Sequence, residues 1–192
     1  MRPFMLITGL LTISLAACAT ERPAAADSPA VVSVPEASNA PAEGPYVFVT
    51  DVGIGDLRAD MTLAQAQGIA PDLRLIAGTD SAECSYLEWP SAPAGVLVMF
   101  DEGRLARFDV DSVGVRTQAG AQVGDRAARL DSLYAGRLTR QPHHYTDGQY
   151  FVVTPLRAAD SLFRLIFEVE NGTVSRYRVG RLPQVEYVEG CS

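Results

Sequence analysis

Two segments of eleven residues, 100–110 and 169–179, align with each other without a gap. An acidic residue, a turn glycine, an arginine, an aromatic residue and a final valine occupy matching positions in both. Each segment centres on a dipeptide that favours a two-residue turn between alternating apolar residues, Glu102-Gly103 or Asn171-Gly172. The sequence therefore predicts two antiparallel β-hairpins, and any fold of this chain must accommodate both.

A helix signal precedes each hairpin. Thr62 and Gln65 have the spacing of a capping box, and Pro71 bounds the short helix that follows. The stretch 126–134 has leucines at helical spacing and ends before Gly136. Short β-prone runs predict three further strands, at 46–49, 150–154 and 185–188.

These elements predict an α+β fold class, with two tandem helix-plus-antiparallel-β-meander repeats in one domain. Repeat 1 spans about 46–115 and repeat 2 about 116–192. We interpret the match between the hairpins as an internal duplication of a helix and three strands. The alternative is that any two hairpins share turn glycines and apolar alternation.

Two pairs of residues introduce the predicted helices, Met61-Thr62 and Val123-Gly124. A helix of this kind followed by a three-stranded meander resembles outer-membrane assembly lipoproteins of the SmpA/OmlA (BamE) type. A tandem pair of such units is similar to the β-lactamase-inhibitory protein family. The resemblance covers roughly Gly53 to Gly180. In that superfamily the sheets form a concave surface that binds another protein, so the resemblance implies protein binding.

The N-terminal residues resemble a bacterial lipoprotein signal. Arg2 is followed by an apolar run, 4–17, which is shorter than the ~20 residues that span a membrane. The run ends in the lipobox sequence Leu15-Ala16-Ala17-Cys18. This resemblance implies cleavage before Cys18 and attachment of diacylglycerol to its thiol. The alternative is ordinary signal-peptidase cleavage after Ala19.

The same resemblance implies a location and a domain organisation. Residues 1–17 are the expected signal peptide, and the mature Cys18 carries acyl chains such as palmitate. Because Ala19 rather than Asp follows the cysteine, the resemblance implies the outer membrane, with the protein facing the periplasm. The Ala- and Pro-rich segment 18–45 is an expected tether, and the folded domain spans 46–192.

Lipidation of Cys18 leaves two cysteines, Cys84 and Cys191. Exported domains meet an oxidising compartment, so we expect a disulfide between these two residues. A reactive thiol is the alternative, but neither cysteine has a Cys-x-x-Cys neighbour or a nearby basic pair that would lower the thiol pKa.

Composition and motifs exclude several function classes. The formal net charge of −7 would repel nucleic-acid phosphates, so we expect no nucleic-acid partner. The sequence contains no nucleophile elbow, phosphate-binding loop or dinucleotide fingerprint. We therefore expect a protein that is not an enzyme, with no catalytic residues and no cofactor.

His143 and His144, followed by Tyr145, form the most concentrated polar group. Two imidazoles with Asp147 suggest zinc, but adjacent residues of a strand point to opposite faces and no further histidine completes the shell. We therefore predict no metal and interpret this group as a loop that contacts a partner.

Two arginines occupy matching slots of the hairpins. With two-residue turns, Arg107 faces Val98 and Arg176 faces Phe167 across the strands. The pair is a candidate basic feature on the sheet surface; the alternative is that each stem covers apolar surface while its head stays in water. Trp89 adds a candidate aromatic contact.

The predicted function is a non-catalytic outer-membrane lipoprotein that binds an envelope protein, either an assembly factor or a hydrolase that it inhibits. The membrane contact is the lipid anchor, and the identity of the partner is unknown. The alternative is a module that binds a small ligand or glycan. The candidate partner-binding residues are Trp89, Arg107, Arg176, His143, His144 and Tyr145.

Lipid attachment gives the first testable prediction. Mass spectrometry of the mature protein should find an N-terminal Cys18 with a diacylglycerol mass, and Cys18→Ala should release the protein from the membrane fraction. The reason is that each buried acyl methylene contributes ~0.8 kcal/mol to membrane binding. An unmodified N-terminus at Ala19 or Thr20 would contradict the lipoprotein interpretation.

Overall fold

The computed structural model of the protein describes residues 48–78 and 83–191. The predicted signal peptide, the lipidation site Cys18 and the tether lie outside the described residues. Two sheets organise the described part of the chain, one with eight strands and one with four.

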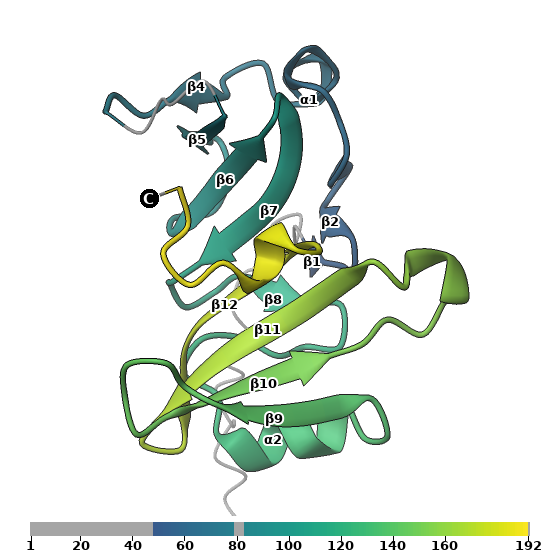
Figure 1. Ribbon diagram of the computed structural model, residues 1–192, viewed down its shortest axis with the longest axis vertical. Coiled ribbons are helices and arrows are strands. Elements are labelled where there is room, and N and C mark those ends of the chain that lie inside the picture. Colours follow the sequence, from purple (N-terminus) through teal and green to yellow (C-terminus); the bar gives the residue numbers. More distant parts are fainter. Residues whose placement is uncertain (1–47, 79–82, 192) are drawn as a thin grey trace, which may run out of the picture. The chain divides into compact units, whose positions relative to one another are not determined.

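The eight-stranded sheet is antiparallel throughout (Figure 1). Its strands run in the spatial order β4 (Arg74–Leu75), β5 (Cys84–Glu88), β6 (Val96–Asp101), β7 (Arg104–Val110), β12 (Thr173–Arg181), β11 (Phe163–Glu170), β10 (Gln149–Val153) and β9 (Leu138–Pro142). Each half is an up-and-down run of four strands. The pairing of β7 with β12 joins the halves, so residues far apart in the sequence share one continuous sheet.

The smaller sheet uses strands of two residues each. Its order is β3 (Leu57–Arg58), β2 (Gly53–Ile54), β1 (Phe48–Val49) and β8 (Arg116–Thr117). Strand β8 runs parallel to β1, and the other pairs are antiparallel.

Helices contribute little to the described residues. The two α-helices, α1 (Leu63–Ile69) and α2 (Ala127–Leu133), have seven residues each. Helix α1 buries only Ala66 and α2 buries only Leu130. Two short 3-10 helices complete the elements, η1 (Ala158–Asp160) and η2 (Gln184–Glu186).

The predicted α+β class with two tandem helix-plus-antiparallel-β-meander repeats is therefore wrong. The fold is β-rich and consists mostly of antiparallel strands, with two helices of only two turns. The helix signals were real, since Thr62 and Gln65 form the expected capping box. The strands supply most of the buried apolar side chains, and the pairing of β7 with β12 joins both halves in one continuous sheet.

The eight-stranded sheet has two unlike faces. The core face carries the main hydrophobic cluster, with Val98, Phe108, Phe151, Phe167 and Tyr177 all at most 2% exposed. The smaller sheet and both α-helices also contribute buried residues to this cluster. The opposite face, here named the strap face, carries a smaller cluster and several buried charges.

A β-bulge in each hairpin decides which side chains reach which face. Phe100 pairs with Leu105, but Met99 pairs with Arg107, so Ala106 is an extra residue on β7. The hairpin of β11 and β12 repeats this irregularity, with Ser175 as the extra residue. Both turns have the positive φ angles expected of their Glu-Gly and Asn-Gly dipeptides.

The bulges overturn the predicted orientation of the two arginines. Arg107 lies opposite Met99 and Arg176 lies opposite Glu168, not opposite Val98 and Phe167. A shift of one residue moves a side chain to the other face of a sheet. Both arginines therefore project from the strap face.

Glycine substitutions test how tightly the two halves of the sheet pack. A Cβ at Gly180 on β12 would lie 2.4 Å from the Cβ of Arg107 and 2.5 Å from the carbonyl oxygen of Ala106. Gly180→Ala should therefore cost ~3 kcal/mol of unfolding free energy in chemical denaturation. Gly68→Ala is the control, since nothing lies within 4 Å of its added Cβ, and it should stabilise α1 by up to ~1 kcal/mol. Wild-type stability of Gly180→Ala would contradict this packing.

Candidate functional site

A C-terminal segment lies across the strap face. This C-terminal strap, residues 182–191, includes η2 and crosses β7 and β12 (Figure 1, yellow). Val185 of the strap is fully buried and packs with Tyr150, Val152 and Ile166 of the sheet. The predicted strand at 185–188 is thus wrong, because a 3-10 turn replaces it.

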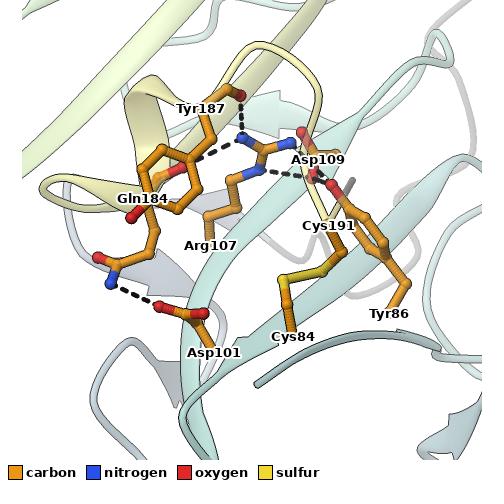
Figure 2. Close-up of a disulfide and its surroundings, with 8 residues drawn as sticks. All are labelled: Cys84, Tyr86, Asp101, Arg107, Asp109, Gln184, Tyr187 and Cys191. Atoms are coloured by element: carbon orange, nitrogen blue, oxygen red, sulfur yellow. Dashed lines mark hydrogen bonds and ion pairs between the residues drawn. A yellow bond between two sulfur atoms is a disulfide. The ribbon is translucent and has the colours of Figure 1, made fainter. Parts of the chain in front are cut away.

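Arg107 holds the strap from below (Figure 2). Its Nη1 donates hydrogen bonds to the carbonyl oxygens of Gln184, at 3.1 Å, and Tyr187, at 2.6 Å. Its Nε donates to Asp109 Oδ2 at 2.9 Å, and its Nη2 donates to the Tyr86 hydroxyl at 2.7 Å. The residue is 4% exposed. We therefore assign this side chain a structural role.

Tyr86 and Asp109 complete the environment of Arg107. The Tyr86 hydroxyl donates to Asp109 Oδ2 at 3.2 Å. Burial, and then the Asp109 carboxylate, raise the pKa of Tyr86 to about 12, so its hydroxyl stays protonated at neutral pH. Burial lowers the pKa of Arg107, but the attraction of Asp109 and Tyr86 outweighs that effect and raises it overall. This group thus keeps the guanidinium charged under the strap.

A second buried arginine, Arg178 on the neighbouring strand β12, also contacts the strap. Arg178 Nε donates to the carbonyl oxygen of Val185 at 2.6 Å, and Nη1 donates to Glu168. Arg178 and Glu168 are 4% and 8% exposed. The exposed Arg176 adds a contact of 3.4 Å from its Nε to Glu168. Removing one member of such a buried pair leaves an uncompensated charge, which is strongly destabilising.

A disulfide joins the strap to the other half of the sheet. Cys191 of the strap is bonded to Cys84 of β5, with an S–S distance of 2.03 Å (Figure 2). Gln184 adds a hydrogen bond of 2.7 Å from its side-chain nitrogen to Asp101 Oδ2. The strap is thus tied to both halves of the sheet by covalent and polar contacts.

His143 belongs to a group that has the composition of a metal site. Ligand atoms of His143, Glu168 and Glu170 lie within 4.8 Å of one another. However, His143 Nδ1 accepts hydrogen bonds from the backbone N–H groups of Tyr145 and Thr146, at 3.1 and 3.2 Å. The ring proton must then sit on Nε2, which faces Glu168 at 3.5 Å. A metal would have to displace that proton, so the geometry favours a structural histidine.

The other predicted contact residues lie in different parts of the described chain. His144 and Tyr145 are exposed, and Tyr145 donates a hydrogen bond to Glu189 of the strap. Trp89 is half-buried and packs against the main core, and its indole N–H has no hydrogen-bond partner in the described residues. The structure brings the His144 loop to the strap and leaves Trp89 beside β5.

Sequence reasoning missed an apolar groove on the core face, at the β4 end of the sheet. Its volume is about 440 Å³, and α1 forms one wall while β4 and β5 form the other. Apolar side chains dominate the lining, namely Leu63, Leu73, Leu75, Leu87 and Phe100. Leu63 is 39% exposed and Leu75 is 49% exposed. Leu63 and Gln67 are four residues apart and therefore lie on one face of α1, and this spacing is the local sequence signal for the groove.

The other half of the sheet has a hollow that can be compared with this groove. A hollow of about 400 Å³ lies beside α2, next to the second hairpin turn. Its lining is mostly polar or small, with Thr146, Asp147, Gln149 and Glu170 around Phe151. The two halves therefore present chemically different surfaces at similar places.

Comparisons with known proteins do not show to which family the chain belongs. No family model matches the chain, and no curated protein matches it. Among solved structures, the chain is similar to the uncharacterized protein YfeY from Escherichia coli. The two share 20% sequence identity at a TM-score of 0.46, over 70% of this chain and 99% of that chain. No functional assignment follows from a likeness of this size.

Within residues 48–78 and 83–191, no helix has the length and apolar character needed to cross a membrane.

The structural role of Arg107 gives a testable prediction. Arg107→Ala should lower the unfolding free energy by ~3 kcal/mol, because the partly buried Asp109 and the strap carbonyls would lose their partner. Arg176→Ala, the control, should cost less than ~1 kcal/mol, because that side chain is 63% exposed. Chemical denaturation measures both, and hydrogen exchange should show faster opening at 184–188 in Arg107→Ala only. Equal losses in both variants would contradict this role.

Proposed function

We propose that this protein is a non-catalytic lipoprotein of the bacterial outer membrane that binds a protein partner in the cell envelope. Cys18 is the anchor, and the Ala- and Pro-rich segment 18–45 connects it to the domain. The partner is an assembly factor or an exported hydrolase. The apolar groove between α1 and β4 is the observation that carries this proposal, since large exposed leucines line it.

The chemistry of the groove suits a protein surface. Scattered apolar side chains are common on soluble proteins, but several around one hollow are typical of interaction sites. The centre of a protein interface is apolar and poor in charge, whereas its rim is polar. Here Leu63 and Leu75 flank the hollow, and Arg74 pairs with Glu88 at its edge, at 2.6 Å.

The neighbouring sheet edge indicates the form of the partner. Among the described strands, β4 is the last in its sheet, and both of its residues are exposed. An extended peptide can pair with such an edge through its backbone while alternate side chains enter an adjacent pocket. We therefore propose that the groove takes an extended partner segment with large aliphatic side chains.

Site-specific crosslinking in cells tests this proposal. A photo-reactive residue at Leu63 of the full acylated chain should give an adduct with one partner. Leu75→Arg should lower the adduct yield at least tenfold, because a charge buried in the apolar centre of an interface costs more than ~1.4 kcal/mol.

Leu162→Arg is the matched control. Leu162 is 54% exposed and lies between η1 and β11, away from the lining of the groove. This variant should keep the adduct at the wild-type level. An adduct that survives Leu75→Arg, or one lost equally in both variants, would remove the groove from the partner-binding surface.

A further inference from the structure

We propose that a second hollow, on the strap face, binds a small carboxylate with a branched apolar body. The hollow has a volume of about 320 Å³ and lies between the strap and strands β9 to β12. It is independent of the groove, which lies on the core face. Its lining residues are Gln141, His144, Tyr150, Val152, Ile166, Arg178, Glu186 and Val188.

Tyr150 provides the first observation for a ligand. The residue is 4% exposed, and its hydroxyl makes no hydrogen bond with any described residue. Its ring stacks on the His143 imidazole, with 4.5 Å between the centroids, and its centroid lies 5.3 Å from the guanidinium carbon of Arg178. A buried hydroxyl without a partner is unfavourable, so its retention at a held position indicates a group that it meets when bound.

Arg178 provides the second observation. Its Nε and Nη1 hold Val185 and Glu168, but Nη2 makes no hydrogen bond within the described part of the chain. Arg178 and Tyr150 both line the hollow, and each has one donor without a partner among the described residues. A carboxylate, with two acceptor oxygens, matches two neighbouring donors, one of them charged.

The charges around the hollow are close to balance. The buried pair of Glu168 and Arg178 is neutral overall, the exposed Arg176 adds a positive charge beside Glu168, and Glu170 adds a carboxylate near His143. Arg178 is the positively charged side chain of the lining itself. Glu186 is the acidic side chain of the lining, but it is exposed and its effect is screened by solvent.

The apolar lining sets the size and shape of the ligand. Val152, Ile166 and Val188 are branched aliphatic residues on the floor and the strap side of the hollow. Small-molecule pockets begin at ~300 Å³, so this hollow suits a small ligand. A branched acid of about five carbons places its methyl groups against these residues and its carboxylate toward Tyr150 and Arg178.

Methyl NMR titration of the folded protein with 3-methylbutanoate tests this site. The expected result is saturable shifts of the Val152, Ile166 and Val188 methyl groups, and about tenfold weaker binding in Tyr150→Phe. The same variant should raise the Tm by about 3 °C, because it removes an unsatisfied buried hydroxyl. A gain in stability with a loss of binding distinguishes a ligand site from a merely structural tyrosine.

Two controls make the result decisive. Tyr145→Phe removes a hydroxyl from a tyrosine outside the hollow and should leave binding unchanged. The amide 3-methylbutanamide should bind at least tenfold more weakly than the acid. A third titration uses the peptide Ala-Ala-Val with a free carboxylate. If the natural ligand is the C-terminus of a peptide, this peptide should bind more tightly than 3-methylbutanoate. If the natural ligand is a free acid, the peptide should bind more weakly. Absence of saturable shifts, unchanged binding in Tyr150→Phe or equal binding of the amide would overturn the proposal.

Discussion

The arrangement of the strap face depends on the two β-bulges. If both hairpins paired regularly, with no bulge at Ala106 or Ser175, Arg107 and Arg176 would point toward the apolar core, where a buried charge is unfavourable. The bulges turn these positions outward, so that Arg107 meets strap carbonyls and Arg176 meets Glu168. One inserted residue in each hairpin therefore separates an apolar face from a charged one.

Most of the polar side chains that the sequence singles out make contacts that stabilise the fold itself. Arg107 and Arg178 hold the strap, and His143 supports its own loop through Nδ1. Their hydrogen bonds are made within the chain, which leaves few of their donors for another molecule. Two surface features have no such role within the fold, the groove beside α1 and the hollow at Tyr150, which Arg178 also lines.

Local signals predicted local structure well. The turns at Glu102-Gly103 and Asn171-Gly172 and the capping box at Thr62 are correct, because each depends on residues within four positions of one another. Strand β9 was missed because four of its five residues are exposed and polar or proline, so no apolar alternation marks it. The bulges, the groove and the role of the strap depend on pairing between distant strands. A short sequence pattern does not indicate such pairing.

The position of Cys191 has a consequence for the order of assembly. Its bond to Cys84 spans a separation of 107 residues, and Cys191 follows every described strand. Every described strand through β12 must therefore be synthesised before this covalent link can form. Before the bond forms, hydrogen bonds and the packing of Val185 hold the strap, so the disulfide fixes the strap covalently only after all of the strands are available to pair.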